Sequence, residues 1–191
     1  MTGPDIPLAR RFARNEEGSQ SVVFLLMLPL LLGAFAALYD ATDAFRVRAI
    51  ARDATAVVSD VLSRQTAPID QTDLDGLRAV ARQLTGLEEE VGLRITQLRC
   101  SGTCEDPGAR TLEVVFSRGA GIAPLGTEDF SAAGMQDAVP MMLEGDRVVL
   151  VQTRFDYPLL FGTPLGTETI ETAHVTRMRF TPRLCWESCN P

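Results

Sequence analysis

An uninterrupted apolar segment, VVFLLMLPLLLGAFAALY, occupies residues 22–39, and none of its eighteen residues carries a charge. As an α-helix that rises about 1.5 Å per residue, the segment is roughly 27 Å long, close to the thickness of the hydrocarbon core of a bilayer. The segment therefore predicts a single membrane-spanning helix at residues 19–39. Residues 1–18 are then a short leader on the cytoplasmic side.

Charge counting leaves the orientation of this span open. Three arginines precede the apolar segment and three follow it closely, so the positive-inside rule gives no clear preference. These residues are Arg10, Arg11, Arg14, Arg46, Arg48 and Arg52. A cleavable secretory signal is the alternative, with Ala34-Phe35-Ala36 as a peptidase site. Apolar sequence and helical periodicity continue beyond Ala36, which favours an uncleaved anchor.

Four cysteines form two C-x3-C pairs, Cys100 with Cys104 and Cys185 with Cys189. Structural zinc sites favour C-x2-C pairs of reduced thiols, so this spacing argues against a bound metal. In a domain beyond a membrane segment, the pairs indicate two disulfides in an oxidising compartment. This places the C-terminal domain outside the membrane and the N-terminus inside. Local loops and cross-bridges between the two pairs both remain open.

The composition excludes some classes of function. The formal net charge of −7 disfavours a nucleic-acid partner, because phosphate binding needs a basic surface. The chain contains no Gly-rich phosphate loop, no H-E-x-x-H and no G-x-S-x-G motif. Its single histidine, His174, lies in an alternating strand pattern and is interpreted as structural. We therefore expect no catalytic residues, no cofactor and no metal.

Two segments after the span have helical periodicity. Apolar residues recur at steps of three and four over residues 40–65, which predicts a helical extension of the anchor. These residues are Ala44, Val47, Ala51, Ala54, Val58, Val61 and Leu62. A second helix is expected over residues 73–84, with early aspartates as its N-cap. Asp70, Asp73 and Asp75 also suggest a calcium loop, but Gln71 and Arg82 occupy ligand positions of that loop.

From residue 91 onward the apolar period changes to two. Four runs, 91–96, 111–116, 148–157 and 170–181, predict antiparallel strands with one covered face. The chain is thus expected to be α+β: a long N-terminal helix packed on a second helix and a roughly four-stranded sheet, with the domain at 70–191.

Two further features leave alternatives open. The Gly- and Met-rich connection at 119–145, with a short helix expected near 131–136, is either a partner surface or an ordered packing insert. Trp186 is either a recognition aromatic or a cover for the core.

The segment FARNEEGSQSVVFLLMLPLLL at residues 12–32 combines an acidic residue and a glycine with a small residue and a Pro-containing apolar helix. The residues concerned are Glu17, Gly18, Ser19, Ser21, Val22, Phe24 and Pro29. This segment resembles the N-terminus of TadE/TadF-like pseudopilins of tight-adherence (Tad, Flp) pilus systems. The downstream order is similar too: a long helix, then VVLVQTRFDYPLLF and HVTRMRFTPR.

The resemblance implies a pilin-like fold, a bacterial inner-membrane location and a periplasmic C-terminal domain. It implies cleavage by a prepilin peptidase between Gly18 and Ser19, with other pilin-like subunits and assembly proteins as partners. Members of the family commonly carry Glu at the fifth position after the cut, where this chain has Val23. That departure favours a minor, non-enzymatic pseudopilin. The alternative is an unprocessed single-pass periplasmic adaptor of an assembly or secretion complex.

Overall fold

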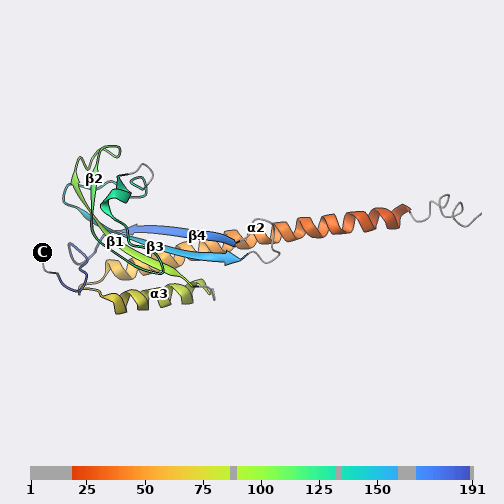
Figure 1. Ribbon diagram of the computed structural model, residues 1–191, viewed down its shortest axis with the longest axis horizontal. Helices are drawn as coiled ribbons and strands as arrows, with labels where there is room; N and C mark the ends of the chain where they lie inside the picture. The colour runs from red at the N-terminus through yellow and green to blue at the C-terminus, as the bar shows by residue number, and fades with distance from the viewer. Residues whose placement is uncertain (1–18, 87–89, 132–134, 159–166, 190–191) are drawn as a thin grey trace, which may run out of the picture. The chain divides into compact units, whose positions relative to one another are not determined.

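The computed structural model describes residues 19–86, 90–131, 135–158 and 167–189 (Figure 1). The chain divides into two compact units, residues 1–42 and residues 43–191. The elements in chain order are α2 (Ser19–Ser63), α3 (Gln71–Thr85), β1 (Gly92–Gly102), β2 (Thr111–Ala120), the 3-10 helix η2 (Thr127–Phe130), β3 (Arg147–Pro158) and β4 (Thr167–Thr176). The predicted α+β fold is confirmed: a long apolar helix, a second helix and a four-stranded antiparallel sheet.

Helix α2 is 45 residues long and continues through Pro29. In the second unit it buries most of the predicted apolar stripe. The buried members that join the main core are Ala44, Val47, Ala51, Val58 and Leu62. The prediction was wrong for Val61, which is 39% exposed. Successive residues of a helix lie 100° apart, so Leu62 and Val61 do not both face the sheet.

Helix α3 begins at Gln71, two residues before the predicted start. Asp70 is its N-cap: the Asp73 N–H donates to Asp70 Oδ1 at 3.0 Å, and the Asp70 N–H donates to Asp73 Oδ2 at 3.0 Å. This reciprocal capping box satisfies amide donors that the first turn leaves without partners. The helix ends at Thr85 and is capped by Gly86, whose φ of 65° is a left-handed conformation that favours glycine. The capping interpretation of the aspartates is confirmed.

The sheet has the strand order β2-β1-β3-β4, and every pairing is antiparallel. In the central register, Ile95 lies between Arg118 on β2 and Val151 on β3. Strand β4 covers Thr167–Thr176, whereas the sequence predicted 170–181. It ends early because the chain turns to the end of α2, where the Arg179 N–H donates to the Ser63 carbonyl at 2.8 Å.

The sheet buries apolar residues on both faces, where one covered face was predicted. The main core lies between the sheet and helices α2 and α3 and includes Val149 and Val151. A second core on the opposite face contains Val148 and Leu150. The connection after β2 covers this second core with Phe130, Val139 and Met142, all at most 3% exposed.

The connection is therefore an ordered packing insert, which was one of its two predicted roles. Its short helix, η2, lies at Thr127–Phe130 instead of 131–136. Within that predicted helix, residues 132–134 lie outside the described part of the chain.

Candidate functional site: an exposed apolar helix

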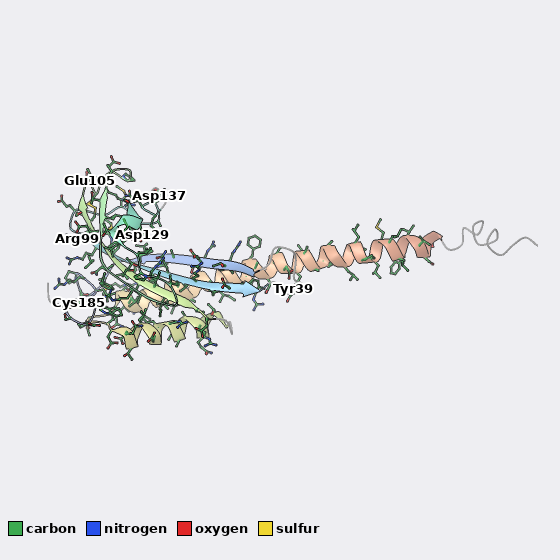
Figure 2. All side chains as sticks on the ribbon, viewed as in Figure 1. Tyr39, Arg99, Glu105, Asp129, Asp137 and Cys185 are labelled. Atoms are coloured by element: carbon green, nitrogen blue, oxygen red, sulfur yellow. A yellow bond between two sulfur atoms is a disulfide. The ribbon has the colours of Figure 1, made fainter. Side chains whose placement is uncertain are left out.

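The described start of α2, residues 20–39, carries large apolar side chains on all sides of the helix (Figure 2). Their exposed fractions run from 41% at Leu28 to 72% at Leu25. The exposed residues are Val22, Val23, Phe24, Leu25, Leu26, Met27, Leu28, Leu30, Leu31, Leu32, Phe35, Leu38 and Tyr39. A single apolar stripe would be typical of a helix that packs on one domain. An apolar surface on every side indicates an apolar environment around this part of the helix.

The free energies involved are large. Burial of one such side chain stabilises by about 1.5–3 kcal/mol, so the whole surface represents roughly 20 kcal/mol or more. A folded domain is stable by only about 5–15 kcal/mol. Helix α2 is the one helix in the described part of the chain that is long and apolar enough to cross a bilayer. Its length and composition fit a single membrane span or a signal sequence.

The predicted processing site lies at the boundary of the described residues. Gly18 falls outside them, and Ser19 is the first residue of α2. Val23, where the resemblance described above implies Glu, lies on α2 with 54% of its surface exposed. Val22 and Phe24 beside it are exposed as well. Val23 thus presents an apolar surface in place of the expected carboxylate.

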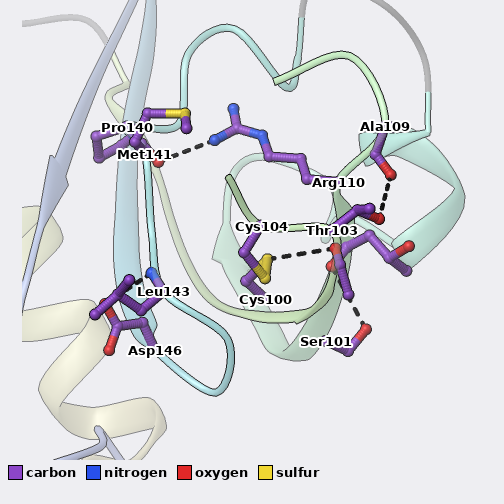
Figure 3. The surroundings of a disulfide bond; sticks show 12 residues. Cys100, Ser101, Thr103, Cys104, Ala109, Arg110, Pro140, Met141, Leu143 and Asp146 are labelled. Atoms are coloured by element: carbon purple, nitrogen blue, oxygen red, sulfur yellow. Dashed lines mark hydrogen bonds between the residues drawn. A yellow bond between two sulfur atoms is a disulfide. The ribbon is translucent and has the colours of Figure 1, made fainter. Parts of the chain in front are cut away.

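The four cysteines form two local disulfides, Cys100–Cys104 and Cys185–Cys189, with Cα–Cα distances of 6.0 Å and 5.1 Å. The first closes the turn after β1 beside the second core (Figure 3). The second closes the C-terminal tail. Of the three pairings that four cysteines allow, the structure has the local one. Among the described residues, no group of three or more His, Cys, Asp or Glu side chains is placed to hold a metal ion.

The C-terminal tail pairs with the loop between α2 and α3. The Ile69 N–H donates to the Cys185 carbonyl at 3.0 Å, and the Glu187 N–H donates to the Ile69 carbonyl at 2.8 Å. Trp186 is half-buried, with its ring centroid 6.1 Å from that of Phe116. The Arg118 guanidinium lies 5.4 Å from the centroid of the Trp186 ring, a cation–π distance. Of its two predicted roles, Trp186 has that of a cover for the core.

Within the residues that the structure describes, one contact, between His174 and Ser59, resembles a catalytic pair. The His174 Nδ1 lies 3.0 Å from the Ser59 hydroxyl. Ser59 is fully buried between α2 and the sheet, so its hydroxyl is out of reach of a substrate. The contact joins α2 to β4, which is a structural role.

A buried arginine is the main feature that the sequence reasoning missed. Arg110 is 4% exposed and donates to the Pro140 carbonyl at 3.0 Å (Figure 3). It also donates to the carbonyls of Val139, at 2.7 Å, and Gln136. These bonds hold the covering segment of the second core in place. The sequence carries no signal for this role, because Arg110 stands beside a turn, where an exposed cation is the ordinary expectation.

No protein-family model, no curated protein and no solved structure matches this chain. The architecture of the chain is pilin-like: a long N-terminal apolar helix, followed by a four-stranded antiparallel sheet.

Proposed function

We propose that this protein is a non-enzymatic minor pseudopilin that takes part in the assembly of a Tad-type adhesive pilus at the bacterial inner membrane. The observation that carries the proposal is the exposed apolar surface of α2 over residues 20–39. The same helix continues into an α+β domain with a pilin-like sheet. A membrane span and a domain that share one helix suit a subunit held among other pilin-like helices.

In this proposal, a prepilin peptidase cuts between Gly18 and Ser19 and leaves α2 intact. The glycine lets the scissile backbone approach the peptidase closely, since it has no Cβ. The mature chain then begins at the start of the membrane helix, with residues 19–39 in the bilayer and the domain in the periplasm. The two disulfides support the periplasmic location, since such bonds persist in oxidising compartments.

Val23 supports a minor role within the assembly. A carboxylate at this position in a filament pairs with the free amine of a neighbouring subunit. The exposed Val23 side chain cannot form this ion pair. The free amine of the neighbouring subunit would then be an unpaired charge in an apolar environment, which is strongly unfavourable. The protein is thus proposed to prime or assist assembly instead of forming the bulk of a shaft.

The test is the N-terminus of the mature protein, determined after expression with and without a prepilin peptidase. A start at Ser19 that depends on the peptidase is the expected result. A start at Met1 in both cases would contradict the proposal and support the unprocessed periplasmic adaptor. A start near Ala37 would indicate an exported protein that has lost its anchor.

Two glycine variants make the test specific. We expect Gly18→Ala to block processing. Gly33→Ala is the matched control: an added Cβ at Gly33 meets nothing within 4 Å, so processing should be unchanged. Normal processing and normal piliation with Gly18→Ala would contradict the proposed cleavage site.

A further inference from the structure

The two disulfides close loops of the same length but differ in burial. Each joins cysteines four positions apart, so the loop-closure entropy is the same for both. Cys100 and Cys104 are 0% and 4% exposed and belong to the second core. In the C-terminal pair Cys185 is 7% exposed, whereas Cys189 is exposed to solvent. Cys189 is therefore the one cysteine of the four that lies open to a reagent in solution.

Access determines which disulfide reacts with an external thiol. Thiol–disulfide exchange begins when a thiolate attacks one of the two sulfurs, and its rate depends on access to that sulfur. Exposed disulfides are accordingly the labile or regulatory ones in proteins. A thiolate from solution can approach Cys189 directly. An attack on Cys100 or Cys104 first requires the second core to open, in which Phe130 and Met142 are packed with them.

The loop that the C-terminal disulfide closes is fastened to the rest of the domain. Between the two cysteines, Trp186 packs against the main core beside Phe116 of β2. The Ile69 N–H donates to the Cys185 carbonyl, and the Glu187 N–H donates to the Ile69 carbonyl. Glu187 has a φ of 57°, a left-handed conformation that is uncommon for residues other than glycine. The disulfide restricts the loop to this conformation, in which both bonds to Ile69 form.

We propose that Cys185–Cys189 is a thiol–disulfide exchange site at which a protein dithiol releases the C-terminal tail. One thiolate of the dithiol attacks Cys189 Sγ, the Cys185–Cys189 bond breaks, and Cys185 leaves as a thiolate that takes up a proton. The second thiolate of the dithiol then attacks its own sulfur in the mixed disulfide and expels Cys189, which also takes up a proton. The dithiol supplies two electrons and two protons and is oxidised to a disulfide.

Reduction opens the tail locally. Without the crosslink Glu187 is free to leave its left-handed conformation, which weakens the bonds between the tail and Ile69. Ile69 and Leu184 are each 2% exposed and belong to the main core, so a released tail uncovers apolar surface at this end of the domain. The end of α2 stays in place, because the Arg179 N–H still donates to the Ser63 carbonyl. This inference goes beyond the proposed function, since it does not depend on how the membrane helix is processed.

The first test is graded reduction of the full-length protein in detergent with dithiothreitol, a small dithiol. Samples are quenched with N-ethylmaleimide, and the labelled cysteines are identified by peptide mass spectrometry. We expect Cys185 and Cys189 to be labelled at least about tenfold faster than Cys100 and Cys104, since Cys189 is the accessible one. The Cys100–Cys104 disulfide is thus a matched control within the same chain. Equal rates for the two disulfides would overturn the proposal.

Reaction with glutathione, a monothiol, identifies the sulfur that is attacked. After a short reaction and a quench with N-ethylmaleimide, we expect glutathione on Cys189 and N-ethylmaleimide on Cys185. The opposite distribution would contradict attack at the exposed cysteine.

Amide hydrogen exchange measures the release of the tail. Once the C-terminal disulfide is reduced, peptides that contain Ile69 or Glu187 should exchange at least about tenfold faster, because the hydrogen bonds of these two amides open. The variant Cys185→Ser with Cys189→Ser should show the same fast exchange without any reductant. Peptides from α3 are the internal control and should be unaffected. Unchanged exchange at Ile69 in the reduced protein would overturn the release of the tail.

Discussion

The hydroxyl of Thr55 on α2 lies 2.6 Å from the hydroxyl of Thr172 on β4 and 2.7 Å from that of Thr153 on β3. The Thr153 and Thr172 hydroxyls are 2.7 Å apart, and Thr55 also donates to the Ala51 carbonyl at 2.8 Å. All three threonines are buried. This polar triangle joins one helix to two strands inside an apolar core. Such a cluster favours one alignment of the helix on the sheet, because its hydroxyls find partners only there.

Thr55→Val should lower the free energy of unfolding by about 1–2 kcal/mol, since it removes hydrogen bonds to two buried hydroxyls without changing the side-chain shape. In the single variant Thr153 and Thr172 can still bond to each other, but one of their two hydroxyl protons has lost the Thr55 acceptor. Replacement of all three threonines by valine should recover part of the loss, because no buried hydroxyl proton is then left without an acceptor. Thr42→Val is the control, since the Thr42 hydroxyl is exposed and donates to the Leu38 carbonyl of its own helix. Denaturant titration of the full-length protein in detergent measures the difference. An equal loss in the single and triple variants would contradict the partner argument.

Arg110→Met should loosen the segment that covers the second core. The variant loses the three carbonyl bonds of Arg110, and we expect a loss of about 2–4 kcal/mol in local stability. Limited proteolysis with mass spectrometry should show new cleavage around residues 135–145. Arg82→Met on α3 is the control and should leave the cleavage pattern unchanged. Equal protection in both variants would show that apolar packing alone holds the segment.

The helices and strands whose apolar residues recur with a single, regular spacing were predictable from the sequence. In helix α2 the apolar residues recur every three or four positions, and in the strands they recur every two, so in each case they fall on one face. The aspartates at the start of α3 indicate its N-cap. The second core was missed because its cover comes from Phe130, Val139 and Met142, which follow no period. A signal was present in residues 148–151: a continuous apolar run in a strand is typical of burial on both faces.

The contacts between distant segments were not predictable. The local pairing of the cysteines, the bonds of Arg110 and the contact between His174 and Ser59 each depend on which residues meet in space. Ser59 lies in α2, and His174 comes more than a hundred positions later in β4. No spacing in the sequence indicates that these two residues are in contact.

Cys185→Ser with Cys189→Ser should release the C-terminal tail around Trp186. Loss of a five-residue loop closure removes about 2 kcal/mol in the chain-entropy model. Trp186 is the single tryptophan of the chain, so its emission reports on this region directly. We expect a red shift, because the ring leaves its contact with Phe116. Cys100→Ser with Cys104→Ser is the matched control and should leave the emission unchanged, and a red shift there would indicate global loosening.

The Arg99 guanidinium hydrogen-bonds to Glu113 across the β1–β2 pair and, with a second bond from Ser101, holds the pKa of the Glu113 carboxyl below its ordinary value. A lowered pKa means that the interaction favours the folded state above the ordinary carboxyl pKa. This contribution is lost as the pH falls through the folded pKa. Arg99→Gln should raise the pKa of Glu113, as measured by NMR titration of its side chain. An unchanged titration would contradict a role for this contact.

A chain that begins at Asp43 should be soluble in water without detergent, whereas the full-length chain should require it. The division of the structure at residue 43 leaves the continuous apolar surface of residues 22–39 outside the second unit. Among the described residues of the second unit, the large apolar side chains that remain exposed are spread over α2, α3, β2, the connection before β3 and the segment after β4: Phe45, Val57, Val61, Val80, Leu84, Val115, Met141, Leu143 and Phe180. Detergent phase partitioning measures the difference. Recovery of the shortened chain in the detergent phase would show that the α+β domain has an apolar surface of its own for membrane or partner binding.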